Sequence, residues 1–371
     1  MKDIVIASAA RTPVGDFGGS MKTLSPTEMG VATAQAAIDR AGIEPGDIQQ
    51  AFYGNVIHTE PRDMYLSRTI AIETGVPETA PALTVNRLCG SGLQSVVSGI
   101  QSIALQDADI VLAGGAESMS RAPYVMPAAR WGQRMGDTPL IDMMVAALHD
   151  PFGHGHMGIT AENVAEKYQI SRETQDAFAV ESHRRAARAT EEGWFEEQIT
   201  PMTIKSRKGD IVFKTDEHVR SDASIEGMAK LRAAFKKDGA VTAGNASGLN
   251  DGAASLVLMS AETAQAKGIS PMARVVSYGH AGVDPKYMGI GPVPAMKNAL
   301  ERAGLAVSDL DVVESNEAFA AQACAVTSEL GLDPEKVKPN GGAVAIGHPI
   351  GASGSVIATK LLYELKRTGG K

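Results

Sequence analysis

The sequence contains few cysteines, few aromatic residues and no long apolar run. Of its 371 residues only Cys89 and Cys324 are cysteine, and aromatic residues make up 5% of the chain. Two cysteines exclude a disulfide-rich scaffold and a four-cysteine zinc site, and they suit a reducing compartment. No stretch approaches the roughly eighteen apolar residues of a membrane-spanning helix, and the apolar start of the chain is too short for a signal peptide. We therefore expect a cytoplasmic protein without a membrane segment.

Positive charge is also scarce relative to negative charge. The 35 Lys and Arg residues are outnumbered by 43 Asp and Glu residues, which gives a formal net charge of −8. Such a chain does not attract nucleic acid at long range, and no block of basic residues offsets the deficit. The remaining composition, 44% hydrophobic and 21% charged, is ordinary for a globular protein with more than one core. We expect small-molecule substrates and no nucleic-acid partner.

Short apolar runs rich in Ile, Val and Leu alternate with helical segments along the chain. This alternation is typical of buried strands in an α/β protein. The first helix is predicted to begin after Ser25, which forms a capping box with Glu28, and to end near Gly42. The predicted strands include residues 4–6, 82–85, 110–113, 255–259, 274–276 and 310–314.

One part of the sequence recurs 262 positions further along the chain. The recurring pieces are Arg40-Ala41-Gly42-Ile43 with Asp47-Ile48, which match Arg302-Ala303-Gly304-Leu305 with Asp309-Leu310, and Ser91-Gly92, which matches Ser353-Gly354. Agreement at one spacing favours a duplicated fold whose halves bring the two Ser-Gly turns together. A more polar stretch separates the halves. We predict an N-terminal half from residues 1–120 and 248–268, an inserted domain at 121–247, and a C-terminal half at 269–371.

Cys89 is the candidate nucleophile. It precedes a predicted helix, where the partial positive charge and free N–H groups lower the pKa of a thiol. Gly90 and Gly92 would let a substrate carbonyl approach the backbone closely. The alternative is a small buried core residue, and Cys324, inside a predicted helix, fits that description better.

His348 and Asn316 are the candidate partners of Cys89. His348 stands in a Gly-His-Pro turn after a predicted strand, just ahead of the turn that the repeat equates with the turn after Cys89. Its alternative is a purely structural histidine. Asn316 follows the predicted strand at 310–314, where its amide could hold an oxyanion, a water or a helix N-terminus. Residues 149–158 contain three histidines and three glycines, but they lack a preceding strand and the usual metal-ligand spacing, so we predict no metal and no dinucleotide site.

Four longer motifs resemble those of the thiolases, above all bacterial acetyl-CoA acetyltransferases and β-ketothiolases. They are Asn-Arg-Leu-Cys-Gly-Ser-Gly-Leu-Gln at 86–94, Gly-Gly-Ala-Glu-Ser-Met-Ser at 114–120, Asn-Glu-Ala-Phe-Ala at 316–320 and Gly-His-Pro-Ile-Gly at 347–351. The resemblance implies two duplicated β/α halves in five layers, with an inserted loop domain that helps to bind coenzyme A. It also implies a homotetramer.

The same resemblance implies roles for individual residues. Cys89 would carry the acyl group, His348 would activate it, and Asn316 would hold a water that completes an oxyanion hole. The residues expected around coenzyme A and the acyl chain are His156, Met157, Ser247 and Phe319 in the pantetheine tunnel, Arg220 near the nucleotide phosphates, and Leu148 and Met288 above the acyl pocket. The implied reaction is thiolysis of acetoacetyl-CoA or another short 3-ketoacyl-CoA, or condensation of two acetyl-CoA. Coenzyme A would be a substrate, and no further cofactor is expected.

One family feature has no match in the sequence. Thiolases use a second cysteine in a Gly-rich segment that the repeat places beyond Lys371. We favour an incomplete C-terminal half that lacks its last strand, and a chain ending there should acylate Cys89 slowly without condensing acetyl-CoA. The alternatives are a non-catalytic CoA-binding homologue, or a cysteine hydrolase that releases free acid.

Overall fold

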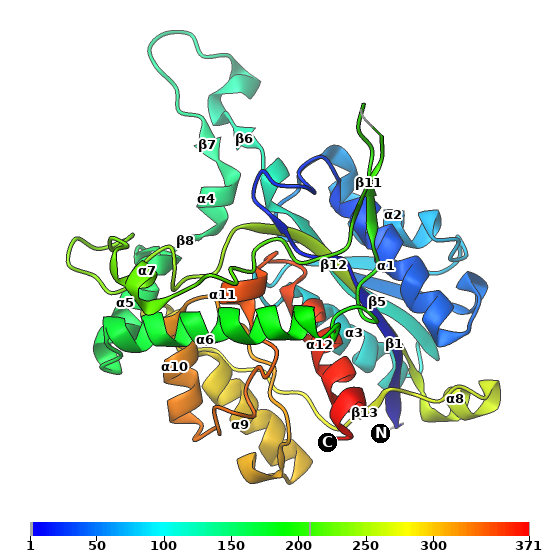
Figure 1. Ribbon diagram of the computed structural model, residues 1–371. Coiled ribbons are helices and arrows are strands. Elements are labelled where there is room, and N and C mark those ends of the chain that lie inside the picture. The colour runs from blue at the N-terminus through cyan, green and yellow to red at the C-terminus, as the bar shows by residue number, and fades with distance from the viewer. Residues whose placement is uncertain (1–2, 208, 371) are drawn as a thin grey trace.

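A mixed seven-stranded sheet organises the first half of the protein, as the computed structural model of residues 3–207 and 209–370 shows (Figure 1). The sheet order is β13 (Ala273–Val275), β1 (Ile4–Arg11), β12 (Asn250–Ser260), β5 (Ile110–Ser118), β3 (Gln50–Gly54) and β4 (Ala82–Val85), with β2 (Gly15–Asp16) paired to β12. The pairs β13–β1, β1–β12 and β12–β5 are antiparallel, and β5–β3 and β3–β4 are parallel. Strand β12 therefore returns to the first half after a long excursion of the chain.

Helices cover both faces of this sheet. Alternation along β5 sends Leu112 into the core beneath α1 (Pro26–Ala41) and α2 (Leu66–Glu73), while its neighbour Val111 joins the core beneath α3 (Ser91–Ala104) and α12 (Ser353–Thr368). The predicted first helix is confirmed, because Ser25 and Glu28 form the capping box and Gly42 ends the helix with a φ of 67°.

The N-terminal turns of α3 and α12 meet in the middle of the molecule. A Cβ atom on Gly92 would lie 2.7 Å from the backbone nitrogen of Ser355, and one on Gly354 would overlap the backbone nitrogen of Leu93. Ser355 Oγ donates a hydrogen bond to the Gly92 carbonyl at 3.0 Å. The two Ser-Gly turns thus lie against each other, as the repeat predicts.

The second half contributes helices and extended segments around α12. Its elements are η5 (Pro285–Ile290), α9 (Pro292–Ala303), η6 (Val307–Asp309), α10 (Ala320–Glu329) and α11 (Ala343–Ile346). Helix α8 (Ala261–Lys267), which follows β12, still packs on β1 and β12 of the first half. Two predicted strands are wrong. Residues 310–314 are extended but have only a single parallel bridge, Val313 to Val337. The segment before His348 forms α11, because the N–H groups of Gly342 and Val344 bond to Ser182 Oγ and Glu317 Oε2 instead of a neighbouring strand.

The chain between β5 and β12 builds a separate set of helices and hairpins. They are β6 (Tyr124–Val125) with β7 (Ile141–Asp142), α4 (Met143–Ala147), β8 (His149–Asp150) with β9 (Gly155–His156), α5 (Met157–Lys167), α6 (Arg172–Glu191), β10 (Met202–Ile204) with β11 (Ile211–Phe213), and α7 (Ile225–Ala229). The β6–β7 hairpin projects from the body of the molecule (Figure 1). Within the described ranges, no helix is long and apolar enough to cross a membrane.

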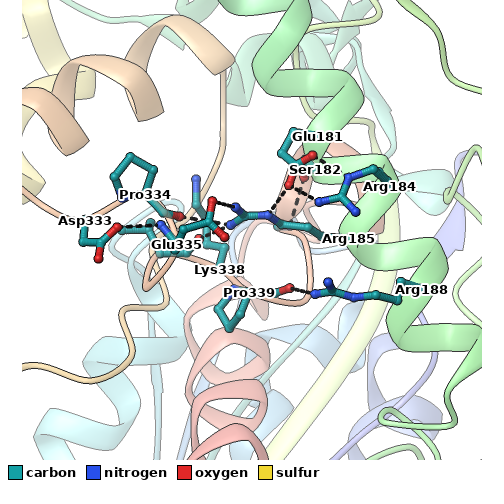
Figure 2. Close-up of polar contacts among 12 residues, drawn as sticks. Glu181, Ser182, Arg184, Arg185, Arg188, Asp333, Pro334, Glu335, Lys338 and Pro339 are labelled. Atoms are coloured by element: carbon teal, nitrogen blue, oxygen red, sulfur yellow. Dashed lines mark hydrogen bonds and ion pairs between the residues drawn. The ribbon is translucent and has the colours of Figure 1, made fainter.

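Helix α6 attaches this inserted region to the second half. Arg185 donates hydrogen bonds to the carbonyls of Pro334 and Val337, at 3.1 and 2.9 Å, and pairs with Glu335 at 3.0 Å (Figure 2). One turn further along, Arg188 donates to the Pro339 carbonyl at 2.9 Å. These bonds fix the 333–339 loop, which leads directly into α11 and His348.

Candidate active site

Cys89 lies just before α3, with Gly90 as the N-terminal cap of that helix. Its half-buried side chain packs against a small apolar cluster centred on Ile57, Met119 and Ile350. Ile350 belongs to the turn that carries His348, so the cluster against which Cys89 packs contains residues from both halves. The apolar packing expected for a core residue and the position before a helix expected for a nucleophile thus occur together at Cys89.

The charge state of Cys89 also differs from expectation. Burial, together with the nearby charge of Glu117, raises the pKa of the Cys89 thiol to about 11. The expected lowering by the start of α3 is outweighed, since the sulfur sits among apolar side chains. In the structure at neutral pH, Cys89 is a thiol that needs a base in order to react.

His348 is buried and is held in one ring orientation. Its Nδ1 lies 2.6 Å from Ser353 Oγ, and that hydroxyl donates its proton to the Pro349 carbonyl at 2.9 Å. Since a hydroxyl has one proton, Oγ accepts from Nδ1–H, which leaves Nε2 with a free lone pair. Asn316 Nδ2 lies 3.4 Å from this Nε2. Burial lowers the pKa of His348 to about 4, so the ring is neutral at pH 7 and can accept a proton.

Asn316 sits between two buried ion pairs. Glu314 pairs with Lys360 at 3.1 Å, and Glu317 pairs with Lys338 at 3.0 Å. Glu317 also accepts a hydrogen bond from Ser182 of α6 at 2.8 Å. The side-chain oxygen of Asn316 is buried without a hydrogen-bond partner among the described residues. The segment is thus held rigidly while one amide acceptor stays available.

A second group of predicted residues gathers around Phe235. The ring of His156 stacks on Phe235 with centroids 4.7 Å apart, and Phe319 meets Phe235 edge-on at 6.1 Å. Ser247 joins this group through hydrogen bonds from its N–H and hydroxyl to the carbonyl of Ala318, at 3.0 and 3.1 Å. His156, Ser247 and Phe319 therefore lie close together around Phe235.

The remaining predicted residues lie on separate elements. The backbone nitrogen of Met157 donates to the Leu148 carbonyl at 2.7 Å, which brings these two together. Met288 lies half-buried in η5, which packs on α5. Arg220 is exposed, and its guanidinium lies 3.6 Å from Asp16, which in turn accepts a hydrogen bond from Asn250. Asn250 holds the His348 N–H at 2.8 Å, so Arg220 is linked to His348 only through other residues.

Ser353, Asn250, Glu117 and Phe235 are site residues that the sequence reasoning missed. Ser353 follows the Gly-His-Pro-Ile-Gly motif by two residues and belongs to the repeated Ser-Gly pair, and Glu117 lies within the Gly-Gly-Ala-Glu motif. Both residues could therefore have been chosen from the sequence. Phe235 and Asn250 reach the site only through long-range packing, and no local pattern marks them.

A cavity of about 380 Å³ lies away from Cys89, between α6 and α10. It is lined by Cys324, whose thiol pKa burial raises to about 11, and by the Glu317–Lys338 pair. The opposite charges of Glu317 and Lys338 neutralise each other. In the part of the chain that the structure describes, no group of three or more His, Cys, Asp or Glu could hold a metal ion. Cys89, His348 and Asn316 are not among the residues that line this cavity.

Comparisons with known proteins identify the family of this chain. Residues 4–262 match the thiolase N-terminal domain, and residues 269–371 match the thiolase C-terminal domain. The chain is 61% identical to beta-ketothiolase BktB and 52% identical to an acetyl-CoA acetyltransferase, both from Cupriavidus necator. Each alignment covers 100% of this chain, together with 94% of BktB and 95% of the acetyltransferase. The crystal structure of human mitochondrial 3-ketoacyl-CoA thiolase in complex with CoA, 43% identical, superposes with a TM-score of 0.97 over 100% of this chain and 93% of that one.

The chain belongs to the thiolase family and has the thiolase fold. It is an enzyme of the acetyl-CoA C-acetyltransferase and 3-ketoacyl-CoA thiolase type, which transfers acyl groups between acyl-CoA and CoA or acetyl-CoA. None of these relatives supports the alternative of a non-catalytic homologue.

Proposed function

We propose that Cys89 carries the acyl group and that His348 takes its proton. The observation that carries the proposal is the hydrogen-bonded array in which Ser353 holds Nδ1–H of His348, so that Nε2 remains a base. A neutral thiol and a neutral imidazole form a working pair only when the proton leaves sulfur as the sulfur attacks. The pKa values of about 11 for Cys89 and about 4 for His348 support this concerted transfer.

In thiolysis, Cys89 Sγ bonds to the 3-keto carbon of the substrate and its proton passes to His348. The bond between that carbon and the α-carbon then breaks, and the departing acetyl-CoA carbanion takes the proton that His348 holds. Coenzyme A next gives its thiol proton to His348 as its sulfur attacks the Cys89 thioester; the shortened acyl-CoA leaves, and the Cys89 sulfur takes the proton back from His348. Asn316, whose side-chain oxygen is buried without a protein partner in the described residues, is suited to hold a water near the oxyanion. No cofactor besides coenzyme A as a substrate is needed for these steps.

Coenzyme A is proposed to lie against the inserted region. His156, Ser247 and Phe319 gather around Phe235 and would flank its pantetheine arm, with Met157 beside them. Arg220 is exposed and positively charged, which suits a contact with the nucleotide phosphates. The residues proposed to bound the acyl end are Leu148 and Met288.

We also propose that the enzyme is a cytoplasmic homotetramer. Both cysteines are free, which suits a reducing compartment. The projecting β6–β7 hairpin exposes Tyr124, Trp131 and Leu140, and the edge strand β4 exposes Leu83. Apolar side chains grouped in this way are typical of surfaces that contact other subunits.

Incubation with acetyl-CoA followed by peptide mass spectrometry tests the proposed nucleophile. We expect one acetyl group on the peptide that contains Cys89. Cys89→Ser should abolish both this label and the thiolysis of acetoacetyl-CoA, whereas the matched variant Cys324→Ser should keep both. An acetyl group on Cys324, or hydrolysis of acetyl-CoA to free acetate without transfer, would refute the proposal.

A further inference from the structure

Glu117 is a buried carboxylate at the end of β5 that four hydrogen-bond donors surround. Oε2 accepts from the backbone nitrogens of Val56 and Gly351, both at 2.9 Å, and Oε1 accepts from Ile57 N at 3.1 Å and Asn55 Nδ2 at 3.2 Å. The side chain is completely buried. A glycine is required at 351, because a Cβ there would overlap Glu117 Oε2. Four donors converging on one acid indicate a built site for a carboxylate.

These donors come from both halves of the protein. Residues 55–57 follow β3 of the first half, and Gly351 follows the turn that carries His348. The backbone of Ile57 binds Glu117 directly, and Ile350 directly precedes Gly351. Both isoleucines are core members of the apolar cluster against which Cys89 packs. Glu117 therefore binds, with one side chain, both the segment that supplies Ile57 to the cluster around Cys89 and the turn that carries His348.

No cation neutralises this carboxylate. Among residues 3–207 and 209–370, no Lys, Arg or His forms an ion pair with Glu117, and the titratable groups whose charges reach it are Asp63 and Cys89. An uncompensated buried anion disfavours a second negative charge nearby. Burial without a cation raises the pKa of Glu117 to about 8, so its charge is fully present only above that pH, where it opposes ionisation of Cys89.

We propose that Glu117 is a positioning residue for acyl transfer, which holds the 55–57 segment and the Gly351 turn against Cys89, and whose charge, once the carboxyl group is ionised, disfavours the Cys89 thiolate. The inference rests on the proposed role of Cys89 as nucleophile. It assigns to the Gly-Gly-Ala-Glu motif a function in the reaction.

Two substitutions separate the position of Glu117 from its charge. Glu117→Gln keeps the length of the side chain but removes its charge. It also places an amide NH₂ group against two N–H donors, with which it cannot form hydrogen bonds. Glu117→Asp keeps the charge but shortens the reach. The matched control is Glu364→Gln, another buried acid, whose carboxylate binds Asn340 and Arg367 at the far end of α12. Each variant is assayed for thiolysis of acetoacetyl-CoA, for thermal unfolding, and for alkylation of Cys89 by iodoacetamide across pH, with Cys89 and Cys324 peptides resolved by mass.

We expect both Glu117 variants to lower kcat ~10-fold or more while KM for CoA changes ~2-fold or less, because the reacting groups are misplaced without loss of the CoA contacts. Only Glu117→Gln should shift alkylation of Cys89 to lower pH. Glu364→Gln should match the wild type in kcat and in the alkylation profile. If Glu117→Gln does not fold, Glu117→Asp and Gly351→Ala test the positioning role, and each should lower kcat.

The proposal is overturned if Glu117→Gln has wild-type kcat and an unshifted alkylation profile, or if kcat falls only in proportion to thermal stability while the profile stays unchanged. It is equally overturned if Glu117→Asp and Gly351→Ala keep wild-type kcat. Such outcomes leave acetylation of Cys89 in the wild type intact. A failure of the proposed nucleophile would instead appear as an active Cys89→Ser enzyme.

Discussion

At the scale of single residues, the tautomer of His348 decides whether the histidine can act as a base. Ser353 Oγ can accept from Nδ1–H because it gives its own proton to the Pro349 carbonyl. The amide of Asn316 faces Nε2 with its NH₂ group, which requires a lone pair on that nitrogen. Both contacts select the same neutral ring, so the histidine is poised before substrate arrives.

Ser353→Ala tests this arrangement. Without the hydroxyl, Nδ1–H loses its acceptor and the ring can rotate or change tautomer, so we expect kcat for thiolysis to fall ~10-fold or more at unchanged KM for CoA. Ser355→Ala is the matched control, because among the described residues its buried hydroxyl bonds only to the Gly92 carbonyl in α3. Equal loss of kcat in the two variants would show that the serines act through helix packing instead.

At the scale of elements, the crossing of α3 and α12 brings the two halves within backbone contact. Gly92 and Gly354 occupy equivalent positions in the repeat, and each lies where a Cβ would strike the backbone of the partner helix. Backbone atoms cannot rotate away as side chains can. The close approach therefore depends on the absence of a side chain at both positions.

Gly354→Ala should destabilise the protein by ~2–3 kcal/mol, because the added methyl overlaps Leu93 N and forces the helices apart. Gly99→Ala, in the same helix pair, provides the control: its Cβ would meet the Val111 side chain at 3.0 Å, and alanine favours a helix by ~1 kcal/mol. Urea unfolding of both variants gives the comparison. A Gly354→Ala protein as stable as Gly99→Ala would contradict a tight crossing.

The elements also show what the sequence can and cannot predict. The capping box of α1 and the repeat that pairs Gly92 with Gly354 are local or periodic patterns, and both predictions are confirmed. The helical turn α11 was not predicted, because its N–H groups bond to Ser182 and Glu317 from distant parts of the chain. The charge of Cys89 was missed for the same reason: the burial and the nearby anion that raise its pKa come from packing, which outweighs the helix start.

At the scale of the whole molecule, buried titratable groups in different regions link stability to pH. Burial lowers the pKa of His348 to about 4, and burial with the nearby charge of His218 lowers that of His183 to about 4. Burial raises the pKa of Glu117 to about 8 against its backbone hydrogen bonds. The histidines stabilise the folded protein above their ordinary pKa of about 6.5, and this contribution is lost as the pH falls towards about 4. Glu117 acts in the opposite direction, since its contribution is lost as the pH rises from about 4.5 to about 8.

Together these groups predict a maximum of stability near pH ~6.5. Below it the two histidines lower the free energy of unfolding by up to ~1.4 kcal/mol per pH unit each, which exceeds the opposing effect of the single carboxylate. Above it, of these three groups only Glu117 acts, so stability is expected to decline again until about pH 8. Urea unfolding midpoints measured between pH 4 and 8 give the curve.

His183→Asn should flatten the acid side of this curve. The Asn side-chain oxygen can still accept the backbone N–H of Arg220, which His183 Nδ1 accepts at 3.1 Å, but the amide does not become charged as the pH falls. A midpoint that rises steadily to pH 8, or an acid side unchanged in His183→Asn, would show that other groups control the stability.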